Sequence, residues 1–226
     1  KRINSAADGA AAQQIIDRLT TQVEGNRQSI SNAYDGVSLT QVAEGGLAGI
    51  NQDVDRIREL SVQSGNGLLS DSDRRAIQSE VTQLQENISQ TIEQTEFAGK
   101  SLLSNNGNID FQVGANAGQK IGVATQDVAA GLSDILNVDL STAQGAEDAL
   151  AIADTANEFV GSARSDLGAT QNQFESAARN LTQTDINVSA ARSRIQDTDF
   201  ATETAEMTKN QILQQAGTSI LAQANQ

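Results

Sequence analysis

The sequence predicts a mainly α-helical protein: an elongated rod of long antiparallel helices, packed as a coiled-coil-like bundle, with one small β-hairpin. Three observations predict this fold class. Proline is absent from all 226 residues, so no proline ring interrupts a helix. Small and apolar residues recur every three or four positions over very long stretches, which is the period of a helix that buries one narrow stripe. Only one short region alternates with the period of two that is typical of a half-buried strand.

The first helix is predicted over residues 10–64. Ile15, Leu19, Val23 and Ile30 fall roughly on one face near its start. Tyr34-Asp35-Gly36 is tolerated within the helix at a cost of about 1 kcal/mol for the glycine. The sequence does not decide between a straight helix and a bent one at this point. Beyond it the buried stripe advances by alternating steps of four and three residues. Its members are Ala43, Leu47, Ile50, Val54, Ile57, Ser61 and Ser64.

The second helix is predicted over residues 70–98. Gly65-Asn66-Gly67 favours the left-handed conformations that end a helix, and Ser70 is a good N-cap. Asp71 and Asp73 then lie at the positive end of the helix dipole. We interpret this acidic cluster as capping, because a calcium loop needs more oxygen ligands and a glycine that do not follow. The expected stripe consists of Ile77, Val81, Leu84, Ile88, Thr91 and Thr95, and the short link makes this helix antiparallel to the first.

A β-hairpin and a short link are predicted over residues 99–140. Residues 109–113 alternate apolar and polar side chains, residues 114–118 are rich in turn formers, and residues 121–123 are interpreted as the returning strand. Asn105-Asn106-Gly107 is expected to form a second turn. The glycines lack the strand-to-helix context of a phosphate loop. Residues 128–140 are expected to be irregular.

The third long helix is predicted over residues 142–197, with Ser141-x-x-Gln144 as a capping box. A helix of roughly 50 residues is about 75 Å long and does not fit inside an ordinary globule. Its expected stripe runs through Ala149, Ile152, Ala156, Phe159, Ala163, Leu167, Thr170, Phe174, Ala177, Leu181, Thr184, Val188, Ala191 and Ile195. Residues 198–226 are also predicted to be helical. Their apolar side chains spread around the helix, which indicates a missing partner.

Composition limits the chemistry of this chain. Histidine and cysteine are absent, and they are among the commonest general bases, nucleophiles and metal ligands. The paired carboxylates Asp53 and Asp55, or Asp197 and Asp199, face apart on a helix. We therefore predict no enzyme, no metal and no cofactor. The net charge of −14 argues against nucleic acid or an anionic membrane as partner, and without a run of about 18 apolar residues we expect no membrane insertion.

Several long stretches resemble bacterial flagellin, in the same order along the chain. On the N-terminal side they are RINSAADGAA (Arg2 to Ala11), NAYDGVSLTQVAEGGL (Asn32 to Leu47), RIRELSVQSGNG (Arg56 to Gly67) and FQVGANAG (Phe111 to Gly118). On the C-terminal side they are SDLGATQNQFESA (Ser165 to Ala177), ARSRIQDTDFATE (Ala191 to Glu203) and ILQQAGTSILAQANQ (Ile212 to Gln226). Together they cover nearly the whole chain.

The resemblance implies a structural subunit that self-assembles into the helical flagellar filament for motility. Residues 1–98 and 141–197 would form the inner filament rod, residues 99–140 the hairpin and a short variable link, and residues 198–226 the start of the C-terminal terminal-domain helix. The subunit would be secreted through the flagellar export apparatus to the extracellular flagellum. Its partners would be other flagellin subunits, an export chaperone and filament cap proteins. The resemblance also implies that both ends are shortened and that the outer domains are reduced to the stretch from Thr125 to Gly145.

Recognition by the host toll-like receptor 5 is a further implication of the resemblance. Arg56, Leu60 and Glu80 stand at the positions that match the receptor contacts of the family, and Asp55 replaces the glutamine that is usual there. In the alternative interpretation, Arg56 is a solvated flank and Leu60 widens the core stripe. A second function also stays open, namely a flagellin-like cell-surface protein that binds a polysaccharide or a host surface. The metalloprotease of some family members needs histidines that this chain lacks.

Overall fold

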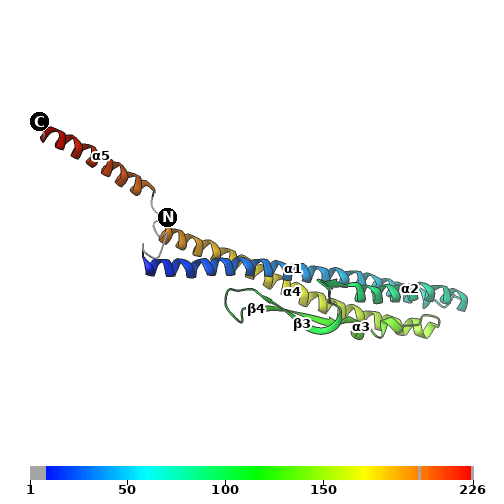
Figure 1. The fold of residues 1–226 in the computed structure, drawn as a ribbon. Helices are drawn as coiled ribbons and strands as arrows, with labels where there is room; N and C mark the ends of the chain where they lie inside the picture. The colour runs from blue at the N-terminus through cyan, green and yellow to red at the C-terminus, as the bar shows by residue number, and fades with distance from the viewer. Residues whose placement is uncertain (1–8, 198–199, 225–226) are drawn as a thin grey trace. The chain divides into compact units, whose positions relative to one another are not determined.

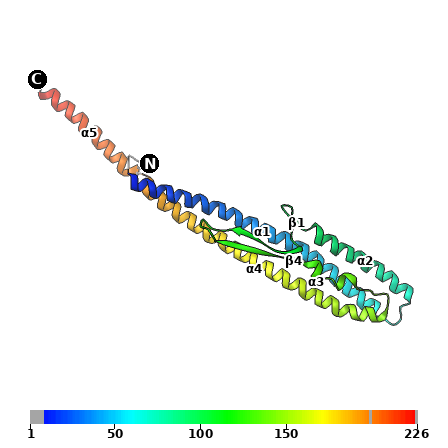
Figure 2. The same cartoon turned by 60° about the horizontal axis from the view of Figure 1, so that its bottom comes forward.

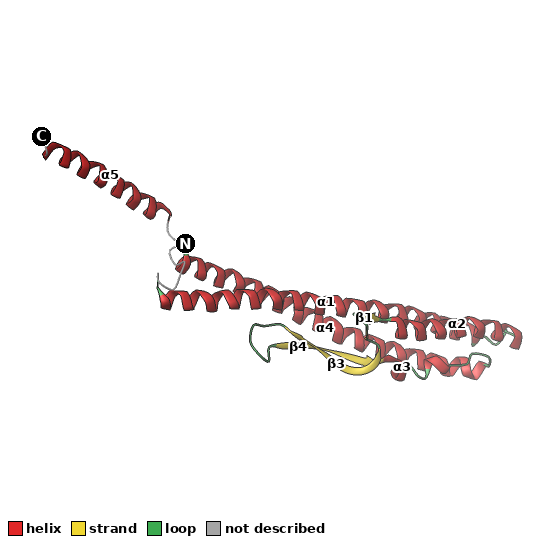
Figure 3. Cartoon of the chain, in the orientation of Figure 1, coloured by secondary structure: helices red, strands yellow, loops and turns green. Residues whose placement is uncertain are grey.

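The computed structural model describes residues 9–197 and 200–224. The chain divides into two compact units, one of residues 26–182 and one of residues 1–25 with 183–226. Four helices dominate the secondary structure and confirm the predicted fold class: α1 (Ala10–Ser64), α2 (Asp71–Gln94), α4 (Ala143–Gln196) and α5 (Phe200–Ala224) (Figure 3). The α1 helix has 55 residues and α4 has 54, so each contributes residues to both units.

In the unit of residues 26–182, α1, α2 and α4 lie side by side, and the hairpin of β3 (Ser104–Gln112) and β4 (Lys120–Asp127) packs on α1 and α4 (Figures 1 and 2). All seven predicted stripe residues of α1, from Ala43 to Ser64, are buried. Near the start of α1 the prediction was partly wrong. Ile15 is 45% exposed, and Ile16 is buried in its place, as Val23 is.

The buried faces of α2 and α4 keep most of their predicted members and include neighbouring residues as well. In α2, Leu84 and Thr91 are only half-buried, and Ile92 lies in the core. In α4, Ala153 and Val160 are buried, whereas Ile152 and Phe159 are half-buried. Each helix packs against more than one neighbour, so its buried face is wider than the narrow seam of a two-stranded coiled coil.

Phe174 joins α1, α4 and the hairpin. It is the largest fully buried side chain, and its ring meets the edge of Phe111 on β3, with 5.4 Å between centroids and 88° between planes. The ring also presses against Gly36, where a Cβ atom would stand 2.5 Å from the phenyl carbons. The helix continues without interruption through Tyr34-Asp35-Gly36, and the glycine makes room for the ring.

The start of α2 confirms the predicted cap, whereas the start of α4 corrects it. The Ser70 hydroxyl accepts a hydrogen bond from the amide of Asp73, whose carboxylate accepts one from the Ser70 amide. Hydrogen bonds from Ser70 lower the pKa of Asp73. At α4 the capping side chain is Thr142 and not Ser141, because the Thr142 hydroxyl accepts from the amide of Gly145 at 3.0 Å. The two candidates are adjacent hydroxyl residues, so the sequence pattern fits both.

The hairpin is longer than predicted. Strands β3 and β4 pair antiparallel from Ser104 with Asp127 to Gln112 with Lys120. The predicted turn at Asn105-Asn106-Gly107 is wrong, because these residues lie within β3 at an irregularity of the ladder.

A second, smaller ladder comes after α2, which ends at Gln94 rather than at 98. It pairs β1 (Glu96–Phe97) with β2 (Lys100–Ser101) through a turn at Ala98 and Gly99. Both turn residues have positive φ, 51° and 75°, as tight hairpin turns require. Alanine rarely adopts this conformation, so the turn has no clear signal in the sequence.

The link from the hairpin to α4 is also more regular than predicted. It contains α3 (Val128–Gly131) and the 3₁₀ helix η2 (Ile135–Asn137). Two glutamines of α2 bind the main chain around the end of η2. Gln85 donates to the carbonyl oxygens of Ile135 and Val138, and Gln78 donates to the Val138 carbonyl and accepts from the Leu140 amide. We call these two side chains the glutamine clamp.

The α5 helix differs from the others because its apolar side chains face solvent. Met207, Ile212, Leu213 and Ile220 are each 54–67% exposed. Its helical state confirms the prediction for residues 200–224. Among the described helices, none combines the length and the apolar character needed to cross a membrane.

Replacing either of two glycines of α1 with alanine should change the stability of the protein, in opposite directions. Gly36→Ala should destabilise the protein by about 1–3 kcal/mol, because the methyl group overlaps the Phe174 ring in a filled core. Gly49→Ala should stabilise it by up to about 1 kcal/mol, because nothing stands within 4 Å of the new Cβ atom and alanine favours the helix. Urea unfolding followed by circular dichroism measures both. Equal effects of the two substitutions would contradict the packing assigned to Phe174.

Candidate functional site

An exposed cluster of three charged side chains lies where α1 and α2 meet. Arg56 donates from Nε and Nη2 to one carboxylate oxygen of Glu80, at 2.9 and 2.8 Å, and from Nη1 to Glu59 at 3.0 Å. We call Glu59, Arg56 and Glu80 the charged cluster. Both cross-helix side chains are about half exposed, at 47% and 49%. The cluster therefore presents a fixed arrangement of charge to the solvent.

Arg56 keeps its positive charge within the cluster. The hydrogen bond to Glu80, followed by the one to Glu59, raises the pKa of Arg56 further above its already high value. The guanidinium consequently remains charged across the physiological range. With each of its three nitrogens donating to a carboxylate, the planar group has a defined orientation.

Of the three positions that the flagellin resemblance marks, the structure brings Arg56 and Glu80 together at the surface and places Leu60 in the interior. Leu60 is 1% exposed and belongs to the core. It therefore offers no surface to a partner in this structure. Its contribution to this region is to hold the last turns of α1 in place.

A second set of polar contacts joins α1 to α4. Arg58 donates from Nε to Asp154 at 2.6 Å, and Asn157 donates to Asp55 at 2.8 Å. The second oxygen of Asp55 accepts from Asn51 at 3.2 Å. Both oxygens of the residue that departs from the family's glutamine are thus engaged within the protein. The sequence analysis did not identify Asp154 and Asn157, because their partners become visible only when the register of the two helices is known.

These contacts define the register of the helices. Further along, Arg164 of α4 pairs with Glu44 of α1 at 3.4 Å, so residue numbers rise along α1 as they fall along α4. Burial raises the pKa of the nearby Asp53 carboxyl. The hydrogen bond to Asp154 raises the pKa of Arg58. Opposite charges along the flanks favour this antiparallel pairing over shifted alternatives.

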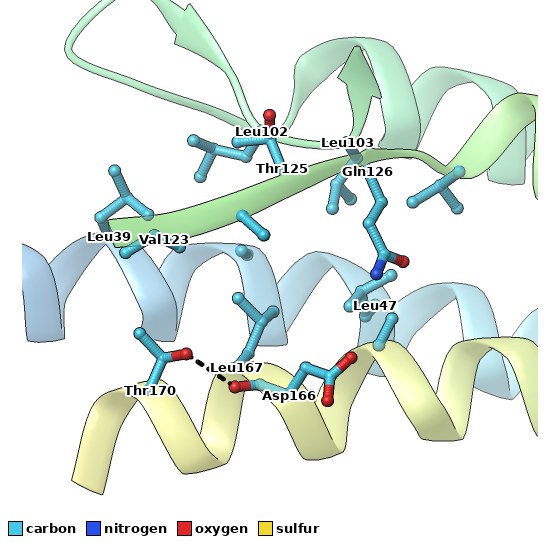
Figure 4. Close-up of a pocket in the computed structure, with 14 residues that line it drawn as sticks. Leu39, Leu47, Leu102, Leu103, Val123, Thr125, Gln126, Asp166, Leu167 and Thr170 are labelled. Carbon is cyan, nitrogen blue, oxygen red and sulfur yellow. Dashed lines mark hydrogen bonds between the residues drawn. The ribbon is translucent and has the colours of Figure 1, made fainter. Parts of the chain in front are cut away.

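An apolar cavity of about 40 Å³ lies under β4, against α1 and α4 (Figure 4). Leu39, Leu47, Val123 and Leu167 contribute to its lining, and the Thr170 hydroxyl at its edge donates back to the main-chain oxygen of Asp166. Ligand pockets usually measure about 300–1,000 Å³, so this space is a packing gap beneath the hairpin. Among residues 9–197 and 200–224, no group of three or more acidic side chains is arranged to hold a metal ion.

Comparisons of the sequence with known proteins find flagellins. Residues 1–108 match the family model of the bacterial flagellin N-terminal helical region, and residues 150–226 match that of the C-terminal helical region. The chain is 38% identical over 260 aligned positions to flagellin of Bacillus subtilis, covering 100% of this chain and 86% of that protein. It is 32% identical over 330 positions to flagellin B of Vibrio cholerae, covering 100% and 88%.

Solved structures share the fold. The crystal structure of Bacillus cereus flagellin superposes with a TM-score of 0.62 at 24% identity, covering 72% of this chain and 94% of that one. A putative flagellar hook-associated protein from Vibrio parahaemolyticus gives a TM-score of 0.72 at 14% identity, covering 84% and 100%.

Substitutions in the charged cluster and in the core should differ in their effect on the stability of the protein. Leu60→Ala should lower the free energy of unfolding by about 2–5 kcal/mol, as expected for a cavity in a packed core. Arg56→Ala and Glu80→Ala should leave the thermal midpoint nearly unchanged, because exposed ion pairs contribute little. Differential scanning calorimetry tests this. A large loss of stability in either charged-cluster variant would show that the cluster is part of the fold's support.

Proposed function

The chain belongs to the bacterial flagellin family, and we propose that helices α1 and α2 add recognition by a host receptor to its structural role. The structural role follows from the family. The protein is a subunit of the extracellular flagellar filament, it assembles with other flagellin subunits, and it serves motility and not catalysis. The observation that carries this is the match of the entire chain to flagellins that it covers almost fully.

Assembly through α5 is the first part of the proposal. The helix carries no charged side chain after Lys209, and Ile212 and Leu213 are each 59% exposed. Such a helix is poorly stable alone in water and gains free energy when its apolar surface is covered. We assign residues 198–226 to the start of the terminal assembly domain, and residues 1–98 and 141–197 to the inner filament rod.

The same exposed helix supports two further partners. Before assembly, an exported subunit with uncovered leucine and isoleucine side chains needs a protein that covers them, and an export chaperone fits this need. At the growing end, filament cap proteins would receive the subunit. Both partners are inferred from the family and from the exposed face of α5.

Recognition by toll-like receptor 5 is the second part of the proposal. The charged cluster supports it, because Arg56 and Glu80 are exposed, fixed in orientation and backed by the buried Leu60. Arginine is favoured as an anchor of protein interfaces. Asp55 is turned toward Asn157 and Asn51, so in this chain it would add little to the contact.

The assembly prediction uses the full-length gene product and fragmented filaments as seeds, observed by electron microscopy. The wild-type protein should elongate the seeds. Ile212→Ser with Leu213→Ser should abolish elongation while the thermal midpoint of the helices stays unchanged, because these side chains support no core in the monomer. The control is Leu68→Ser, which removes a 93% exposed leucine outside α5 and should still elongate. Normal elongation by the α5 variant would refute the role given to this helix.

The receptor prediction uses cells that report activation of toll-like receptor 5 by the purified monomer. Arg56→Ala and Glu80→Ala should each raise the half-maximal concentration by about tenfold or more, as loss of an interface anchor does. Arg179→Ala removes an equally charged side chain that is 72% exposed on α4 and should leave the response unchanged. If all three variants act alike, the charged cluster is not the contact. If the wild-type protein does not activate the receptor in these cells, receptor recognition is rejected and the filament role is unaffected.

A further inference from the structure

Two asparagine–glycine pairs occur in the described chain, and the fold treats them differently. They are Asn66-Gly67 in the turn between α1 and α2, and Asn106-Gly107 within β3. In such a pair the glycine amide nitrogen can attack the side-chain amide carbon of the asparagine, because glycine has no side chain to obstruct the approach. Whether this happens in a folded protein depends on where the structure holds the asparagine side chain.

At Asn66 the side chain is held by a hydrogen bond to the chain that follows it. The amide of Leu68 donates to Asn66 Oδ1 at 3.1 Å, so the asparagine side chain folds back over the peptide bonds that come after it. Attack by the Gly67 nitrogen would place negative charge on Oδ1. The Leu68 N–H already points at that oxygen, in the manner of a donor in an oxyanion hole.

Space around Asn66 also permits the reaction. Asn66, Gly67 and Leu68 are all exposed, and a Cβ atom placed on Gly67 would meet nothing within 4 Å. Water and a five-membered ring can therefore be accommodated without displacing a neighbour.

Asn106 provides an internal contrast. Its Oδ1 accepts from the amide of Asp127 at 3.0 Å, which ties the side chain to the opposite strand, β4. Gly107 pairs with Thr125, whose hydroxyl would stand 3.1 Å from a Cβ atom on the glycine. Ring closure at Asn106 must first break the cross-strand hydrogen bond.

We propose that Asn66 is a site of spontaneous deamidation in the folded protein, and that Arg74 directs the product toward isoaspartate. In the first step the Gly67 nitrogen loses its proton and forms a bond to Asn66 Cγ, and the side-chain nitrogen takes up a proton and leaves as ammonia. The product is a cyclic imide. Water then adds to one of its two carbonyl carbons and breaks the bond from that carbon to the Gly67 nitrogen.

Arg74 favours one of the two hydrolysis routes. Its side chain is buried, with 6% exposed, and Nη2 donates to the main-chain oxygen of Asn66 at 3.2 Å and to that of Leu69 at 3.4 Å. Together with the Leu69 amide, which donates to the same oxygen at 3.1 Å, this charged donor polarises the main-chain carbonyl of the imide. Attack of water there leaves the Gly67 nitrogen attached to Cγ, which is isoaspartate, and turns the former main-chain carbonyl into a free carboxylate.

The new carboxylate lies beside a guanidinium that donates to neutral main-chain oxygens. Arg74 Nη1 is buried without a hydrogen-bond partner in the described structure. A carboxylate formed from the atoms that Arg74 already contacts would convert a hydrogen bond to a neutral oxygen into a charge-assisted one. Each event also adds one negative charge to a turn that already precedes Asp71 and Asp73.

The test is mass spectrometry of the full chain, incubated folded in H₂¹⁸O and then digested with trypsin. The two pairs fall in separate peptides, residues 59–74 and residues 101–120. In the folded protein, Asn66 should deamidate about tenfold faster than Asn106, reflecting the hydrogen bond that must break at Asn106. In urea the two rates should converge. Equal rates in the folded state, or faster reaction at Asn106, would overturn the site assignment.

The role of Arg74 is tested by the ratio of products. Isoaspartate is quantified by enzymatic methylation with isoaspartyl methyltransferase. The ratio of isoaspartate to aspartate should be higher in the folded wild type than in the urea-unfolded chain, and Arg74→Met should lower the folded ratio toward the unfolded one. An unchanged ratio in wild type on unfolding would refute the directing role even if the variant fails to fold. Asn66→Gln should gain no ¹⁸O at residue 66 and serves as the background control.

Discussion

The buried stripe of α1 is the constraint on which the rest of the structure depends. From Ala33 to Leu60 its small and apolar residues face inward on one continuous helix, and α2, α4 and the hairpin all pack against it. Because the chain has few large aromatic residues, this core is built from many modest contacts and one large one, the Phe174 ring between Gly36 and Phe111. Alanines of α4, such as Ala149, Ala153 and Ala156, are fully or nearly fully buried. Small facing side chains let long helices approach closely over their length, so stability is distributed along the bundle.

The polar flanks determine which alignment of the helices is used. A heptad-like stripe alone permits the helices to slide by one repeat without exposing apolar surface. The pairs Glu44 with Arg164, Asp55 with Asn157, and Arg58 with Asp154 are satisfied together in only one antiparallel register. They are partly exposed, so their main effect is on specificity and not on total stability. The charged cluster between α1 and α2 does the same on the other flank, which is why a surface feature proposed for recognition is also part of the alignment of the bundle.

The four long helices and the hairpin could be predicted from the sequence because they depend on periodicity and local turn chemistry. The stripe of α1 from Ala43 to Ser64 and the cap at Ser70 were correct to the residue, since they follow from spacing and from a single side chain. The predictions failed where tertiary contacts decide. The resemblance marked Leu60 as a receptor contact, but Leu60 is buried in the core, as in the alternative interpretation in which it widens the core stripe. Asn105-Asn106-Gly107 has turn composition but lies in a strand, because pairing with β4 outweighs local preference. The turn at Ala98 and the regular link after β4 have no strong local signal. Of the candidate site, the positions of Arg56 and Glu80 were available from the resemblance, but their ion pair required the register of two helices.

The glutamine clamp has a consequence for how this family varies. Gln78 and Gln85 hold the link by its peptide groups, at Ile135, Val138 and Leu140, and the Ser64 hydroxyl donates to the Leu140 carbonyl. Every residue except proline offers the same main-chain N–H and C=O groups. The hydrogen bonds of the clamp therefore depend little on which side chains the link carries. The link after β4 is thereby held at a fixed place on the helices, while its side chains can change. Alignments of these 226 residues with two relatives extend over 260 and 330 positions, and an attachment that binds only the backbone tolerates changes of sequence in the link.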